Sequence, residues 1–205
     1  MKRKLALFDM DNTLTRGHSI FAFYRFGLRR RPLCILLLPL LLLAYPLYLL
    51  GILSAQTVKA IGYSPIGGMT QADLAEFYEK VLLPRRIPAT FDLLEQYRNE
   101  GYLVGILSAS AEAYVREFGE HGLCDFVIAS PLRRKENGRY SPLPAGPNCA
   151  GEEKKKRLSA FLAAHQIEPD FENSVAYSDS AGDLPMLSFA ATRFRVTKNG
   201  SVKPW

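Results

Sequence analysis

The chain has 205 residues, of which 48% are hydrophobic and 22% are charged, and its formal net charge is +6. This length suffices for one core, or for a core with a smaller inserted unit, and the apolar content excludes a disordered chain. Three widely spaced cysteines exclude a disulfide framework and a zinc-finger spacing. The positive charge is typical either of a protein with an anionic partner or of an ordinary soluble surface.

The first predicted element is a buried strand over residues 5–8 that ends at two carboxylates, Asp9 and Asp11. These carboxylates interrupt the basic start of the chain at once, so we expect no cleavable signal peptide. Ligands of an open α/β sheet bind at the carboxyl ends of its strands. Two close carboxylates repel each other, and a divalent cation would neutralise them. One carboxylate could then act as a nucleophile and the other as an acid and base. The alternative is a surface turn, which Asp and Asn favour.

Residues 33–53 form an uncharged, Leu-rich segment that follows three arginines, residues 29–31. The segment is long enough to span a bilayer core as a helix. A single span would separate Asp9 from any site residue that follows the segment. We therefore expect a helical hairpin, broken near Pro39 or Pro46, that enters or lies on a membrane with the arginines at anionic headgroups. The alternative is a hairpin buried inside a helical cap.

The next elements are predicted to be two helices, over residues 71–83 and 89–100. The pattern then alternates, with strands over 103–107, 126–129, 174–177 and 194–196, and helices over 111–119 and 152–165. Residues 130–148 are expected to form a loop or a short hairpin, and the tail from Thr197 is expected to be exposed. Strands that alternate with helices predict an α/β fold with a doubly wound parallel sheet.

Polar side chains end two of the later strands as well. Ser108 follows the strand over 103–107, while Asp179 and Asp183 follow the strand over 174–177. A parallel sheet brings such ends to one edge, where the carboxylates could complete an oxygen shell for magnesium. Taken singly, each residue could instead be a turn or cap residue, and Lys154 could lie on a solvated helix face.

Together these motifs resemble the haloacid dehalogenase superfamily of phosphatases with an aspartate nucleophile. The matching stretches occur in the expected order and are Asp9-Met10-Asp11-Asn12-Thr13-Leu14-Thr15, Gly105-Ile106-Leu107-Ser108, Gly151-Glu152-Glu153-Lys154 and Tyr177-Ser178-Asp179-Ser180-Ala181-Gly182-Asp183. The resemblance implies a Rossmann-like, three-layer α/β core made of residues 1–15 plus 88–205. It also implies an inserted all-helical cap of residues 16–87, as in the phosphoserine-phosphatase-like branch, subfamily IB.

The resemblance also implies roles for these residues. Asp9 would be the nucleophile that forms an aspartyl phosphate, and Asp11 the general acid and base. Ser108 and Lys154 would bind phosphate oxygens. The implied cofactor is Mg²⁺, and its implied ligands are Asp9, the backbone carbonyl of Asp11, Asp179 and, in a supporting role, Asp183.

The expected substrate is a lipid phosphate. Residues 16–19 contain no acidic residue of the kind with which phosphoserine phosphatases bind the substrate amine. The basic, Leu-rich segment and residues 177–180 and 193–197 are instead similar to membrane-associated members such as phosphatidylglycerophosphatase C. We therefore expect a magnesium-dependent phosphomonoester hydrolase at the cytoplasmic face of the cytoplasmic membrane, acting on a lipid such as phosphatidylglycerophosphate. Further candidates for substrate contact are His18, Arg133, Arg134 and Arg139, which are alternatively structural or solvated.

Two other functions stay open at this point. One is a soluble cytoplasmic phosphatase of a small molecule, phosphoserine-like or another metabolite. The other is a non-enzymatic membrane-associated protein on the same fold. Nucleic acid is not an expected partner, because the basic residues lack interleaved aromatic residues. The oligomeric state and the choice between hydrolysis and transfer to another acceptor are likewise open.

Overall fold

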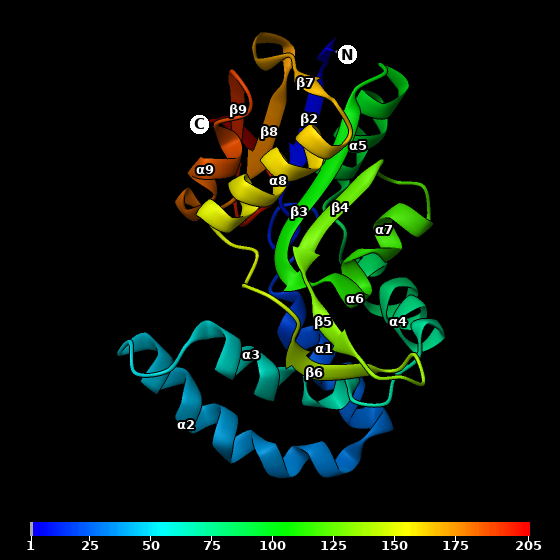
Figure 1. Ribbon diagram of the computed structural model, residues 1–205, viewed down its shortest axis with the longest axis vertical. Helices are drawn as coiled ribbons and strands as arrows, with labels where there is room; N and C mark the ends of the chain where they lie inside the picture. Colours follow the sequence, from blue (N-terminus) through cyan, green and yellow to red (C-terminus); the bar gives the residue numbers. More distant parts are fainter. Residues whose placement is uncertain (1) are drawn as a thin grey trace.

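The computed structural model describes residues 2–205. A six-stranded sheet forms the centre of the fold, in the order β10-β9-β8-β2-β3-β4 (Figure 1). All neighbouring strands are parallel except β10, which is antiparallel to β9. The strands are β2 (Leu5–Phe8), β3 (Leu103–Ala111), β4 (Phe126–Ser130), β8 (Val175–Ser178), β9 (Thr192–Val196) and β10 (Val202–Pro204). The predicted α/β fold with a doubly wound parallel sheet is confirmed.

The first strand of the core, β2, is fully buried in the middle of the sheet. Its neighbours come from distant parts of the chain, because Leu5 pairs with Leu103 and Ala6 pairs with Val175. The backbone N–H of Asp9 donates to the carbonyl of Tyr177 at 3.0 Å. The register therefore places Asp9 at the carboxyl-terminal end of the central strand, between β3 and β8.

Helices cover both faces of this sheet and make three layers. Successive side chains of a strand point to opposite faces, and accordingly Ala6 and Phe8 belong to one buried cluster while Leu5 and Leu7 belong to another. The first cluster contains side chains of α5 and α6, and the second those of α8 and α9. The core helices are α5 (Pro88–Asn99), α6 (Glu112–Val115), α7 (Glu117–Glu120), α8 (Glu152–Ala164) and α9 (Leu184–Leu187).

A helical insertion separates β2 from α5 and lies at one end of the molecule (Figure 1). It consists of α1 (Ser19–Arg30), a 3-10 helix (Pro32–Leu37), α2 (Leu38–Leu49), α3 (Ala55–Gly62), a 3-10 helix (Ser64–Ile66), α4 (Gln71–Phe77), a π-helical turn (Tyr78–Leu82) and a 3-10 turn (Leu83–Arg85). The division into residues 16–87 and 1–15 plus 88–205 stays a prediction.

The hairpin of β5 (Leu132–Arg134) and β6 (Tyr140–Pro144) contacts this insertion. The N–H of Gly68 donates to the carbonyl of Tyr140 at 3.2 Å, and Arg139 donates to the carbonyl of Gly68 at 2.9 Å. Of the two predictions for residues 130–148, the short hairpin is therefore the correct one. Its contacts join the insertion to a part of the chain that follows β4.

The apolar segment forms a helical hairpin, but the predicted position of its break is wrong. Residues Pro32–Leu49 are continuously helical, with a mean hydropathy of 2.2. Pro39 lies in the first turn of α2, where the missing N–H is not needed, and Pro46 lies inside the helix. The chain turns instead at Gly51, whose φ of 73° favours glycine. From there α3 packs against α2 (Figure 1).

This segment is also not the buried cap helix that the alternative prediction required. Only 11% of residues Pro32–Leu49 are buried. Large apolar side chains at its start and end are among the most exposed, with Leu33 at 79% and Leu50 at 73%. The helix thus presents apolar side chains to the surroundings.

Two further differences from the sequence analysis concern the core. The predicted helix over 111–119 is split into α6 and α7 at Arg116. The tail after Thr197 turns at Gly200, whose φ is 87°, and pairs with β9 as β10. A small parallel pair, β1 (Lys2–Arg3) with β7 (Glu168–Pro169), flanks the sheet.

Candidate active site

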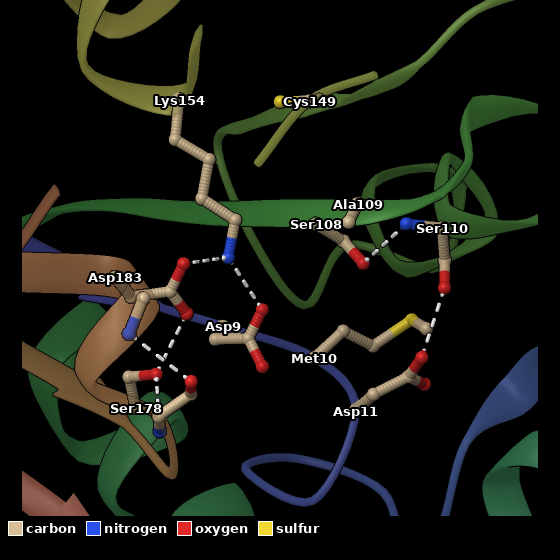
Figure 2. Close-up of polar contacts among 12 residues, drawn as sticks. Asp9, Met10, Asp11, Ser108, Ala109, Ser110, Cys149, Lys154, Ser178 and Asp183 are labelled. Carbon is tan, nitrogen blue, oxygen red and sulfur yellow. Dashed lines mark hydrogen bonds and ion pairs between the residues drawn. The ribbon is translucent and has the colours of Figure 1, made fainter. Parts of the chain in front are cut away.

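An ion cluster lies at the carboxyl end of β2. Lys154, in the first turn of α8, places its Nζ 2.6 Å from Asp9 Oδ1 and 2.8 Å from Asp183 Oδ1 (Figure 2). Lys154 is only 2% exposed and Asp9 only 7% exposed. The structure thus brings together Asp9, Lys154 and Asp183, which are far apart in the sequence.

Burial and mutual charge perturb these groups. Burial and, to a smaller extent, the charge of Asp183 raise the pKa of Asp9 to about 7, against the opposing charge of Lys154. Burial alone would lower the pKa of Lys154, but the carboxylates of Asp9 and Asp183 outweigh it and raise that pKa to about 12. Lys154 therefore stays charged beside the nucleophile candidate at neutral pH.

Asp11 is held by uncharged hydrogen-bond donors instead. It accepts hydrogen bonds from the Ser19 N–H at 3.0 Å, from Ser19 Oγ at 3.2 Å and from Ser110 Oγ at 2.9 Å. Burial raises the pKa of Asp11, and the hydrogen bonds from Ser19 oppose this shift. Figure 2 shows the Asp11 carboxyl turned toward Ser110, on the side away from Lys154.

A tight turn connects the two carboxylates to α1. Asn12 has a φ of 60°, in the left-handed region that Asn tolerates better than most residues with a side chain. Its N–H donates to the carbonyl of Thr15 at 2.7 Å, and its Oδ1 accepts from the Gly17 N–H at 2.9 Å. This geometry accounts for an Asn at position 12.

The ends of β3 and β8 lie at the same edge. Ser108 is buried, and its Oγ accepts from the N–H of Ser110 at 3.0 Å. Ser178 Oγ donates to Asp183 Oδ2 at 2.7 Å. Burial raises the pKa of Asp179, and the charge of Asp183 adds to this rise.

These residues fit a hard divalent cation. Within residues 2–205 no group of three or more Asp, Glu, His or Cys side chains is arranged as a metal site, but the expected ligand set also uses the Asp11 carbonyl. The donors are oxygens, as Mg²⁺ requires. The charge of Asp183 raises the pKa of both Asp9 and Asp179, so negative charge is in excess around Lys154. A bound cation would offset that excess.

The other candidate residues behave differently. His18 begins α1, and its charge is close enough to affect the pKa values of Asp11 and Asp179. Arg133 instead donates to the carbonyl of Pro144 at 3.2 Å, within the β5–β6 hairpin. Arg134 stacks on the ring of Tyr140 in the same hairpin, and Arg139 bonds to Gly68 of the insertion. The structure thus places His18 within electrostatic range of Asp11 and Asp179 and gives the three arginines other partners.

Three serines of the site were missed by the sequence analysis: Ser19, Ser110 and Ser178. Ser110 had a usable signal, because it lies two residues after Ser108 at a predicted strand end. Ser178 similarly adjoins Asp179. Ser19 had none, because its role depends on how α1 packs against the end of β3.

A family model of haloacid dehalogenase-like hydrolases matches residues 6–188, which is most of the chain. The chain belongs to this family. This haloacid dehalogenase-like hydrolase is 29% identical over 188 residues to Protein CicA of Caulobacter vibrioides (strain NA1000 / CB15N), covering 91% of this chain and 82% of that protein. It is 22% identical over 215 residues to the histidinol-phosphatase of Neisseria meningitidis serogroup C (strain 8013), covering 98% and 93%.

Solved structures support the fold of this hydrolase. A protein of unknown function from Bordetella pertussis Tohama I superposes with a TM-score of 0.76 at 22% identity, covering 94% of this chain and 89% of that chain. A substrate-bound phosphoserine phosphatase complex superposes with a TM-score of 0.64 at 19% identity, covering 94% and 85%. At these identities the similarity shows the shared α/β fold.

Proposed function

We propose that this hydrolase is a magnesium-dependent phosphomonoester hydrolase that forms an aspartyl phosphate on Asp9. The main observation behind the proposal is that two nearby carboxyl groups, Asp9 and Asp11, lie in different environments. Asp9 lies 2.6 Å from the fixed cation of Lys154, whereas Asp11 accepts hydrogen bonds from neutral serine donors. Carboxyls in such different environments suit different roles, one as nucleophile and one as proton donor. The phosphatase names of two similar proteins support this assignment.

In the proposed first step, an Asp9 oxygen bonds to phosphorus while the bond from phosphorus to the leaving oxygen breaks. Asp11 gives its proton to that oxygen, which departs as an alcohol. In the second step, Asp11 takes a proton from water as the water oxygen bonds to phosphorus and the bond from phosphorus to Asp9 breaks. Inorganic phosphate leaves, and both residues return to their starting states. The burial that raises the pKa of Asp11 favours its protonated form and so supports its role as the acid.

The phosphoryl group would be held by Ser108 and Lys154 at the end of β3 and the start of α8. Lys154 would contribute a fixed positive charge toward the phosphoryl oxygens. Magnesium bound by Asp9, the Asp11 carbonyl and Asp179, with Asp183 in support, would supply further charge neutralisation at the phosphate. This assignment follows the resemblance to the superfamily and is supported by the buried ion cluster.

We further propose that the substrate is a membrane lipid phosphate. The support is the exposed apolar surface of the α2 hairpin, where Leu36 is 73% exposed and Leu43 is 62% exposed. Soluble proteins rarely expose large contiguous apolar patches unless these are contact sites. Arg29, at the start of this segment, is exposed and would face anionic headgroups, whereas Arg30 pairs with Asp73 and Glu76 and Arg31 donates to the carbonyl of Gly67. The resemblance to subfamily IB and to phosphatidylglycerophosphatase C points in the same direction.

The segment would enter one leaflet and return. Asp9 precedes it and Lys154 follows it, yet their side chains are in contact. A single crossing would put them on opposite sides of the bilayer. The turn at Gly51 and the return along α3 support a dipping hairpin, and the basic residues support the cytoplasmic face of the cytoplasmic membrane.

A substrate panel tests the chemistry. The purified protein is incubated with phosphatidylglycerophosphate, lysophosphatidate, phosphatidate and phosphoserine, with magnesium or with a chelator, and released phosphate is measured. We expect magnesium-dependent release that is highest for a lipid and is abolished in Asp9→Asn. Equal activity of Asp9→Asn would refute the assigned nucleophile. Preference for phosphoserine would favour the soluble alternative, and no release from any substrate would favour the non-enzymatic one.

Vesicle sedimentation tests the membrane contact separately. We expect the protein to pellet with vesicles containing anionic phospholipid, and we expect Leu43→Glu to reduce the pelleted fraction. Leu143→Glu is the matched control, because Leu143 is an exposed leucine, 49% accessible, on the β5–β6 hairpin outside the segment. Equal loss in both variants, or a wild-type protein that stays in the supernatant, would refute contact through α2.

A further inference from the structure

Lys59 is a further cation near the candidate active site. It lies on α3, the return arm of the apolar hairpin. Its Nζ donates to the carbonyl of Ala109 at 2.6 Å and to Asn148 Oδ1 at 2.7 Å. Both acceptors are neutral, and Lys59 takes part in no ion pair within residues 2–205. Its charge is therefore not neutralised by a direct partner in that part of the chain.

Lys59 contacts the chain between two residues of the candidate site. Ala109 lies between Ser108, the candidate phosphate ligand, and Ser110, which bonds to Asp11. Burial lowers the pKa of Lys59 to about 8, and the charges of Asp11 and Lys154 also act on it, in opposite directions. Lys59 is thus within electrostatic reach of Asp11 and Lys154.

A purely structural role does not account for this charge. Ser130 Oγ already donates to the Ala109 carbonyl at 2.8 Å and lies 3.1 Å from Asn148 Oδ1. The single hydroxyl hydrogen of Ser130 can bond to only one of these oxygens at a time, but it is a neutral donor within hydrogen-bond distance of both. A second neutral donor in place of Lys59 would serve the fold as well as an ammonium, and it would avoid the cost of partly burying a charge.

We propose that Lys59 binds a second anionic group of the substrate, a phosphodiester located a few bonds from the phosphomonoester. This inference rests on the proposed function and specifies its substrate class. Helix α3 follows the exposed apolar segment in the chain, and its Lys59 contacts Ala109, the residue after Ser108 in β3. A lipid with its acyl chains at α2 and its terminal phosphate at Asp9 would therefore bring its headgroup phosphodiester toward Lys59.

The test compares substrates that differ in the second anion. Short-chain dihexanoyl phosphatidylglycerophosphate carries a phosphodiester, dihexanoyl phosphatidate carries none, and phosphoserine carries a carboxylate without acyl chains. For Lys59→Met we expect the ratio of kcat/KM for phosphatidylglycerophosphate over phosphatidate to fall about 10- to 100-fold, as for the loss of one charged hydrogen bond. Lys59→Arg should retain most of the ratio. Lys80→Met is the control, because Lys80 is an exposed lysine of the insertion that pairs with Glu76.

The outcomes separate this inference from the proposed function. An unchanged ratio in Lys59→Met, with both activities reduced equally, would overturn the inference and leave the phosphatase proposal standing. A selective loss with phosphoserine alone would also overturn it, because the second anion would then be a metabolite carboxylate. Absence of phosphate release by the wild-type protein from all three substrates would instead refute the proposed function. Thermal unfolding of each variant checks that Lys59→Met is folded.

Discussion

Replacement of Lys154 by Met tests the ion cluster most directly. The substitution keeps the length of the side chain but removes a charge that lies 2.6 Å from Asp9 and 2.8 Å from Asp183. At an effective dielectric constant of about 20, each contact corresponds to about 6 kcal/mol of attraction. The variant has no ammonium group to desolvate on folding, and this offsets several kcal/mol of the lost attraction. We therefore expect a net destabilisation of about 3–5 kcal/mol, typical of one partner lost from a buried pair.

The size of this effect should depend on pH in a defined direction. The pKa of Asp9 is raised to about 7 in the folded protein, from an ordinary value of 3.8. A raised carboxyl pKa favours the folded state below the unfolded value, and this contribution is lost as the pH rises through the folded value. Removing Lys154 raises the Asp9 pKa further. The destabilisation should therefore be full at about pH 8 and less than about half as large at about pH 5, where Asp9 is protonated in both proteins.

Urea unfolding without magnesium, at both pH values, measures the effect. Lys155→Met is the matched control, because Lys155 is the next residue of α8 and is exposed. It should change the free energy of unfolding by about 0.5 kcal/mol or less. An equal destabilisation at both pH values, or the same effect from Lys155→Met, would refute the argument that Lys154 is held by ionised carboxylates.

Two other substitutions test the surroundings of the site. Ser110→Ala removes the hydrogen bond to Asp11 and should lower kcat about 10-fold or less, the effect expected for one hydrogen bond. Steady-state phosphate release measures this change. An unchanged kcat would contradict the role given to Ser110. Gly27→Ala should destabilise the protein by about 1–3 kcal/mol, although alanine favours helices, because the added Cβ would lie 2.2 Å from the Cβ of Pro65. Urea unfolding measures this second effect, and a stabilised variant would show that the contact between α1 and the 3-10 helix Ser64–Ile66 relaxes freely.

Sequence reasoning predicted the α/β core because its signals are local. Buried apolar runs that end in Asp9, Ser108 or Asp179 specify both a strand and its functional edge. The position of the hairpin turn was not predictable in the same way. A break was predicted near Pro39 or Pro46, yet Pro39 lies in the first turn of α2 and Pro46 is tolerated inside this helix. The chain turns at Gly51 instead.

The supporting side chains of the site were harder to predict. Ser19 and Lys59 reach the site only because the insertion folds back on the end of β3, which no short-range pattern encodes. The pairing of β10 with β9 was missed for a related reason, since the polar residues after Thr197 are typical of an exposed tail. Residues in recognisable motifs were thus accessible from the sequence, whereas their contacts required the tertiary structure.

The strand order has a consequence for the order of events during synthesis. Strand β2 is made early, but its neighbours in the sheet begin only at Leu103 and Val175. Proteins are synthesised from the N-terminus, so the apolar hairpin leaves the ribosome well before β2 can pair. The nascent chain therefore exposes its apolar hairpin while the α/β core is still incomplete. Contact with a lipid surface at this stage would shield that segment from aggregation and leave the core to close afterward, once β8 has been made.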